Sequence, residues 1–152
     1  MLNQLQERNA LAETMGGPDK VARQHQRGRL SARERIETLC DADSFNEYGA
    51  LAGGNHPGGP PPLAGDGLVG GSARFEGRSV DIVAEDFSVK GGSIGHPTAA
   101  KRARLVRLAA EERLPLVLML DGAGDRADNQ NERYPNSPGD LQLVADLQGQ
   151  VP

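Results

Sequence analysis

The chain has 152 residues, a net charge of −4, and many glycines (20) and prolines (10). This length is typical of one domain with its own core, and the small aromatic fraction (3 %) means that leucine, valine, isoleucine and alanine must fill that core. The negative charge argues against a general nucleic-acid or membrane-surface binder, and the single cysteine, Cys40, excludes an intrachain disulfide. No apolar run approaches the ~20 residues that a membrane span needs. We therefore expect a cytoplasmic α/β protein with no nucleic-acid or membrane partner.

The first part of the chain, residues 1–48, is predicted to be helical. Helix-favouring residues fill positions 2–14, and a second helix is expected over Asp19–Gln26 with its first residue as the cap. Ser31 and Glu34 have the spacing of a capping box, which predicts the start of a third helix. Seven lysines and arginines lie among the first forty residues, against five acids. A solvated helical face is the default interpretation of these cations, and phosphate binding is the alternative.

The second part, residues 49–66, is a loop rich in glycine and proline. Gly65, Gly67 and Gly70 have the G-x-G-x-x-G spacing of dinucleotide-binding loops. That motif requires a strand before it and a helix after it, whereas here a proline-rich loop precedes it and a strand-like segment follows. We therefore reject a dinucleotide site.

The third part, residues 67–152, alternates strand-like and helix-like patterns. Two strand-like segments joined by a turn at Glu76–Arg78 indicate a hairpin, and the helix that follows predicts a crossover to a parallel strand. That strand, Leu116–Leu120, is a continuous apolar run typical of a strand covered on both faces. The expected elements are strands over Leu68–Phe75, Val80–Val89 and Leu116–Leu120 and helices over Thr98–Arg113 and Gly139–Gln148.

Other site motifs in this part are incomplete. The motif Gly91-x-Ser93-x-Gly95 matches the nucleophile elbow of hydrolases, which also needs an acid and then a histidine later in the chain. The only later histidine is His96, which precedes every candidate acid. The acids between Asp121 and Glu132 imitate the spacing of a calcium loop but lack its internal glycine. The three histidines of the chain have no ligand spacing, so we predict no metal site.

Several motifs follow one another in a family-specific order. They are Gly16–Lys20, Gly28–Ile36, Asp43–Glu47, Ala84–Val89 and Gly91–Gly95. Together they resemble the carboxyltransferase (beta) subunits of biotin-dependent acyl-CoA carboxylases, and the propionyl-CoA carboxylase beta type is most similar in pattern. The resemblance implies an α/β, crotonase-like fold of ββα units preceded by N-terminal helices. It covers only the N-terminal portion of the family's length, so the fold is expected to be incomplete relative to the family.

The resemblance implies enolate chemistry without a side-chain nucleophile. Carboxybiotin releases carbon dioxide, and the enolate of an acyl-CoA, held by backbone N–H groups, attacks it. Loss of one such donor typically costs ~3 kcal/mol, about a hundredfold in rate. The family's first oxyanion loop maps onto Asp121–Arg126, which assigns the catalytic N–H groups to Ala123 and Gly124. The residues expected to bind substrate are Ser88, Gly91, Gly92, Ser93, Gly95 and Gly122.

The resemblance also implies a cofactor and partners. Biotin is carried on a partner protein or domain, and the expected partners are a biotin carboxyl carrier, a biotin carboxylase and carboxyltransferase subunits in a homo- or hetero-oligomer. Because the family's second oxyanion loop and C-terminal domain are missing, the isolated chain is expected to be an incomplete enzyme. Two alternatives stay open: a non-catalytic assembly partner of a full-length subunit, and a decarboxylase of malonyl-type CoA esters.

Overall fold

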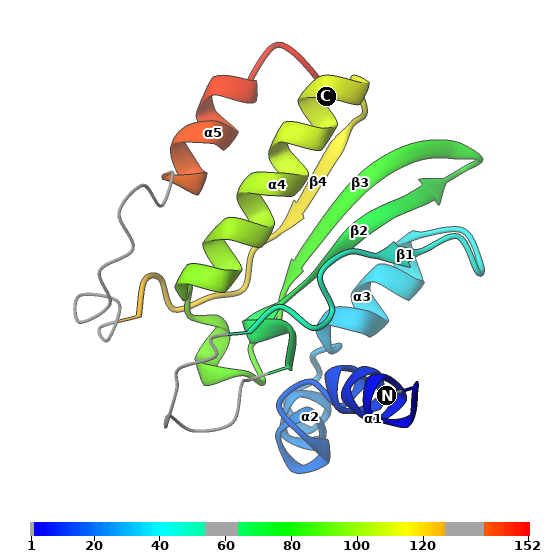
Figure 1. Cartoon of the computed structure of the whole chain (residues 1–152), viewed down its shortest axis with the longest axis vertical. Helices are drawn as coiled ribbons and strands as arrows, with labels where there is room; N and C mark the ends of the chain where they lie inside the picture. The colour runs from blue at the N-terminus through cyan, green and yellow to red at the C-terminus, as the bar shows by residue number, and fades with distance from the viewer. Residues whose placement is uncertain (1, 54–63, 127–138) are drawn as a thin grey trace.

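The computed structural model describes residues 2–53, 64–126 and 139–152, and it folds them into a small sheet with helices on both faces (Figure 1). The strands are β1 (Asn46–Glu47), β2 (Leu68–Phe75), β3 (Arg78–Glu85) and β4 (Leu116–Met119). The helices are α1 (Leu2–Glu13), α2 (Pro18–Gln26), α3 (Ala32–Leu39), α4 (His96–Glu112) and α5 (Asp140–Leu147). Most of the loop expected over residues 49–66 lies outside the described residues.

The predicted hairpin joins β2 and β3, which pair antiparallel with Phe75 opposite Arg78. Its two turn residues, Glu76 and Gly77, have φ angles of 48° and 75°, and this turn geometry matches the twist of the flanking strands. The carboxylate of Asp41 accepts both turn N–H groups, at 3.0 and 2.8 Å. The hairpin prediction is confirmed, but β3 ends at Glu85 rather than Val89 because the chain turns after it.

The core has two halves, one on each face of the sheet. On one face, Ala32 and Ile36 of α3 pack against alternate residues of β2 and β3. On the other face, Leu105 of α4 packs against Leu68 and Val83. The period-2 alternation of β3 thus supplies side chains to both halves.

Two helix starts test the predicted caps. The capping box of α3 is confirmed, because Glu34 N–H donates to Ser31 Oγ (3.3 Å) and Ser31 N–H donates to Glu34 Oε2 (2.7 Å). The predicted cap of α2 is wrong: this helix begins at Pro18 with Gly17 as its N-cap, so Asp19 lies in the first turn. Proline suits this first position because its φ is fixed and it has no N–H to satisfy.

The strand β4 is the last in the order β1-β2-β3-β4 and pairs parallel with β3, as the crossover predicted. All four of its residues are only half-buried. Val117 and Met119 nevertheless pack against one half of the core, and Leu116 and Leu118 pack against the other, so the strand is covered on both faces as expected. Within the described residues no further strand lies beside the outer edge of β4.

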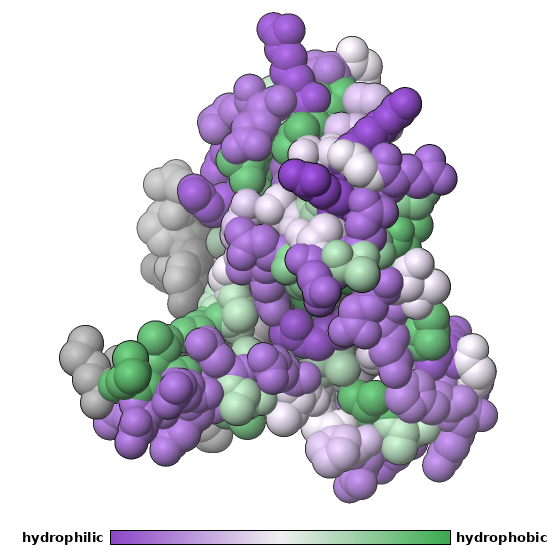
Figure 2. Space-filling view, turned by 90° about the vertical axis from the view of Figure 1, so that its right-hand side faces the viewer, coloured by the Kyte–Doolittle hydropathy of each residue, from purple (hydrophilic) through white to green (hydrophobic). Residues whose placement is uncertain are grey.

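The molecular surface is mixed in character. On the face shown in Figure 2, hydrophilic residues dominate and hydrophobic ones form small, separate groups. None of the described helices is both long and apolar enough to cross a membrane.

Candidate active site

Two glycine-rich loops, residues 91–95 and 121–126, lie side by side. Ile94 N–H donates to the Gly124 carbonyl (2.8 Å), and Arg126 N–H donates back to the Ile94 carbonyl (3.0 Å). These bonds form an isolated parallel bridge between Ile94 and Asp125. The structure thus brings together the two loops that the sequence identified separately.

Glycine is required where the two loops touch. A Cβ atom on Gly122 would lie 2.5 Å from the Gly92 carbonyl oxygen, and one on Gly92 would lie 2.6 Å from the Asp121 carbonyl oxygen. Real Cβ contacts are longer than this, so any larger residue would push the loops apart. Gly92 and Gly122 therefore have a packing role as well as their predicted role in substrate binding.

The end of the second loop is fixed by an ion pair. Arg126 Nη1 lies 2.6 Å from Asp66 Oδ1, and Asp66 Oδ2 accepts a hydrogen bond from Thr98 Oγ1 at 3.0 Å. Gly95 lies directly beneath this pair, and a Cβ there would collide with the Arg126 guanidinium. The first turn of α4 and the second loop are therefore held together.

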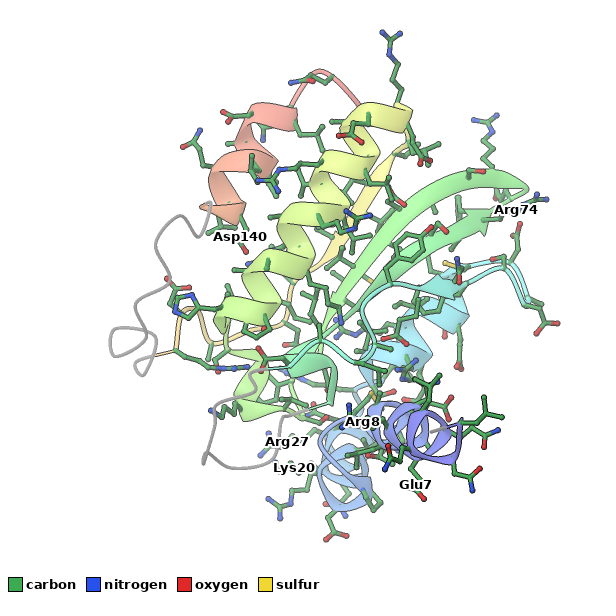
Figure 3. All side chains as sticks on the ribbon, in the orientation of Figure 1. Glu7, Arg8, Lys20, Arg27, Arg74 and Asp140 are labelled. Carbon is green, nitrogen blue, oxygen red and sulfur yellow. The ribbon has the colours of Figure 1, made fainter. Side chains whose placement is uncertain are left out.

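The start of the second loop is fixed by a buried carboxylate. Glu85, at the end of β3, accepts the Asp121 N–H at 2.7 Å with one oxygen and the Arg102 guanidinium at 2.8 Å with the other. Arg102 also donates to Asp140, the first residue of α5, which is labelled in Figure 3. Glu85 lies within the motif Ala84–Val89, but nothing in the sequence indicated that it would meet Arg102 and Asp140.

The two predicted catalytic amides differ in availability. Ala123 N–H donates to the Gly91 carbonyl at 3.1 Å, so the prediction that it is a free donor is wrong in this structure. Gly124 N–H has no hydrogen-bond partner in the part of the chain that the structure describes. Gly124 is exposed, and open space surrounds the position of its missing Cβ. Gly124 is thus the better candidate donor for a ligand.

The two predicted serines already make protein contacts. The hydroxyl of Ser88 donates to Asp86 (2.5 Å) and accepts the Gly16 N–H (2.9 Å). The hydroxyl of Ser93 donates to the Lys90 carbonyl at 2.8 Å. Both hydroxyls therefore hold loops in place, and Ser88 also lines the pocket described next.

A basic pocket of about 350 Å³ adjoins the first glycine-rich loop. Three of its cations come from α2 and its C-terminal end, where Figure 3 labels Lys20 and Arg27. Its lining also includes the aromatic ring of Phe87 and Gly91. We call this the basic pocket; its four cations are Lys20, Arg23, Arg27 and Lys90. The excess of cations in the first forty residues was its only sequence signal.

Arg29 connects the N-terminal helices to the second loop. Its guanidinium lies 3.3 Å from the Asp121 carboxylate and 5.8 Å from the centre of the Phe87 ring. The side chain is half-exposed, and such a pair contributes ~0–1 kcal/mol. Arg29 is therefore a weak link between the basic pocket and the loop.

The sequence matches the model of the carboxyl transferase domain over residues 23–144. The chain belongs to the carboxyl transferase family. It is 36 % identical over 132 residues to a propionyl-CoA carboxylase beta chain of Cereibacter sphaeroides, covering 83 % of this chain and 25 % of that protein. It is 40 % identical over 125 residues to a biotin-dependent long-chain acyl-coenzyme A carboxylase beta4 subunit of Mycobacterium tuberculosis, covering 82 % of this chain and 24 % of that protein. The predicted resemblance is thus confirmed.

The fold of this carboxyl transferase chain matches solved structures. Superposition on the transcarboxylase 12S subunit, which was solved with methylmalonyl-coenzyme A and methylmalonic acid bound, gives a TM-score of 0.81 at 28 % identity. It covers 96 % of this chain and 28 % of that one. The α/β, crotonase-like fold is therefore confirmed, and the chain spans about a quarter of the length of the curated relatives it matches.

Proposed function

We propose that this chain forms the acyl-CoA-binding part of a biotin-dependent acyl-CoA carboxyltransferase. One observation carries the proposal: the basic pocket and the second glycine-rich loop share Gly91, which lines the pocket and accepts the Ala123 N–H. A ligand with phosphates at one end and a thioester at the other could occupy both places. Coenzyme A esters have this arrangement.

The phosphate end has suitable chemistry in the basic pocket. Charge-assisted hydrogen bonds from arginine and lysine to phosphate are among the stronger polar contacts in proteins. No carboxylate among the described residues pairs with Lys20, Arg23 or Arg27. The Phe87 ring offers an apolar face on which a planar base could stack.

The thioester end would meet the Gly124 N–H. In the enolate the thioester oxygen becomes negatively charged, and a fixed backbone donor then stabilises it more than it stabilises the ground state. The neighbouring loop bonds hold Gly124 in place before the ligand arrives. One such donor is worth ~3 kcal/mol.

Biotin, carried on a partner, would supply the carboxyl group. The pocket beside the glycine-rich loops is lined by four cations and suits phosphate better than the neutral ureido ring of biotin. We therefore assign no biotin site to the described residues. The proposed partners are a biotin carboxyl carrier, a biotin carboxylase and further carboxyltransferase subunits, which would provide that side of the reaction.

Titration calorimetry of the whole chain with propionyl-CoA tests the proposal. We expect saturable binding that weakens roughly tenfold in Arg23→Ala and in Arg27→Ala, because each substitution removes a charged hydrogen bond worth ~1.5 kcal/mol. The matched control is Arg107→Ala, an exposed cation on α4 outside the basic pocket, which should bind as the parent chain does.

Two other results would count against the proposal. Equal affinities for the pocket variants and Arg107→Ala would remove the basic pocket from the binding site. Stable binding to a full-length carboxyltransferase subunit, without binding of any CoA ester, would favour the non-catalytic assembly partner.

A further inference from the structure

A buried network of three charged residues lies beneath the second glycine-rich loop. Arg102 of α4 donates from Nη1 to Glu85 (2.8 Å) and from Nε to Asp140 (2.7 Å). The exposed fractions of Glu85, Arg102 and Asp140 are only 4 %, 1 % and 8 %. Charges this deeply buried are costly unless they are paired. We call these residues the Glu85–Arg102–Asp140 network.

One atom of this network reaches the candidate site. The second oxygen of Glu85, Oε2, accepts the N–H of Asp121 at 2.7 Å. The same oxygen would lie 2.6 Å from a Cβ on Gly122, so the backbone of the loop rests directly on the carboxylate. Gly124, whose N–H is the candidate donor, is only three residues beyond Asp121.

We infer that Glu85 and Arg102 are positioning residues for the Gly124 N–H. Glu85 fixes the start of the loop, and Arg102 fixes the orientation of the Glu85 carboxylate. This inference rests on the proposed function, since it assigns a role in the binding of the enolate at the same site.

Arg102 has a second effect, which is electrostatic. A carboxylate beneath the loop repels the negative charge that develops on an enolate oxygen, and burial reduces the screening of that repulsion by water. The Arg102 guanidinium, 2.8 Å from the carboxylate, compensates this charge. Loss of Arg102 should therefore be more harmful than loss of the charge on Glu85.

The test compares two probes with the whole chain. One is coenzyme A itself, and the other is a coenzyme A analogue that ends in a nitronate, a stable anion shaped like the enolate. Calorimetry gives the affinity for the nitronate analogue divided by the affinity for coenzyme A. This ratio reports the contribution of the acyl end, because both probes share the phosphate end. We expect Arg102→Met to lower this ratio at least tenfold, and Glu85→Gln to lower it less. The affinity for coenzyme A itself should change less than twofold in both.

Two further variants separate positioning from general damage. In the double variant Glu85→Gln/Arg102→Met the side chain that accepts the Asp121 N–H is uncharged, although Asp140 also loses its partner, so the ratio should recover in part. Arg107→Met, on the exposed side of the same helix, should leave the ratio unchanged. Where Arg102→Met does not fold, Arg102→Lys is the substitute. It keeps the charge but lacks the planar guanidinium that donates to Glu85 and Asp140 at once, so it should still lower the ratio.

A second readout does not depend on ligand binding. A carboxylate acceptor moves an amide proton downfield, so Glu85→Gln should shift the Asp121 amide signal upfield and should also move the signal of Gly124. The inference is overturned if the Gly124 signal stays unchanged in Glu85→Gln, or if the affinity ratio is unchanged in Arg102→Met and Arg102→Lys. A parent chain that binds neither probe would instead refute the proposed function, and the Gly124 signal would still decide this inference.

Discussion

Asp81 is completely buried in β3, and in the described part of the chain neither of its carboxylate oxygens has a hydrogen-bond partner. Burial raises the pKa of Asp81 to about 6, and the nearby Glu112 carboxylate adds to the effect. The folded state therefore binds this proton more tightly than the unfolded state, whose pKa is near the ordinary 3.8. The contribution of this protonation to stability is fully present below the unfolded pKa, and it is lost as pH rises through the folded pKa.

Asp81→Asn removes the charge and keeps the shape of the side chain. We expect the free energy of unfolding to increase by about 1–3 kcal/mol at pH 7.5 and to differ little from that of the parent chain near pH 4. Urea unfolding at pH 4, 6 and 7.5 measures this difference. The same difference at all three pH values would show that the charge of Asp81 is not its source.

Gly122→Ala tests the contact between the two glycine-rich loops. The added methyl group would collide with the Gly92 carbonyl and with Glu85, so we expect a loss of about 1–3 kcal/mol in the free energy of unfolding. Gly139→Ala is the matched control, because the nearest atom to its new Cβ would be 3.6 Å away, an ordinary contact. Equal stability of the two variants would contradict the close approach of the loops.

At the scale of elements, α2 and α3 begin in different ways. Ser31→Ala breaks the capping box of α3 and should lower the free energy of unfolding by ~1 kcal/mol. Asp19→Ala removes only a favourable charge from the first turn of α2, an effect of ~0.3–1 kcal/mol that salt should weaken. Thermal unfolding of both variants at low and high salt distinguishes them. A larger loss of stability in Asp19→Ala than in Ser31→Ala would indicate that Asp19 caps α2.

Elements with local signals could be predicted from the sequence. The Ser31–Glu34 spacing gave the start of α3, and the Glu76–Gly77 pair gave the β2–β3 turn. The predicted cap at Asp19 was wrong although its signal is local, because Pro18 already suits the first helical position. Features that depend on distant neighbours could not be predicted. The half-burial of β4 follows from its place at the edge of the described sheet, which an apolar run of residues does not encode.

The candidate site shows the same division. The sequence identified both glycine-rich loops, and the excess of N-terminal cations indicated phosphate binding as one option. It could not show that the Ala123 N–H is occupied, because its acceptor, Gly91, is 32 positions away and lies on the other loop. The Glu85–Arg102–Asp140 network joins three elements, and although Glu85 lies in the motif Ala84–Val89, only the packing of those elements reveals its partners.

At the scale of the whole molecule, the described sheet has an open edge along β4. The Leu116 N–H donates to the Pro152 carbonyl at 3.0 Å, away from β3. Because successive N–H groups of a strand point in opposite directions, the Leu118 N–H faces the same open edge. In the parallel register with β3, Leu118 lies opposite Val83, at the centre of the sheet. We expect the Leu118 amide to exchange with solvent at least tenfold faster than the Val83 amide, since exchange follows local exposure and bonding. Equal protection would mean that another strand covers this edge.

The central claim is that one CoA ester spans the basic pocket and the second glycine-rich loop. The most direct measurement is a titration of the glycine-labelled chain with propionyl-CoA, followed by the amide signals in heteronuclear NMR spectra. We predict saturable shifts of Gly91 and Gly124, with Gly77 in the distant β2–β3 turn unaffected. Saturable binding that leaves Gly124 unmoved, or no binding at all, would contradict the account.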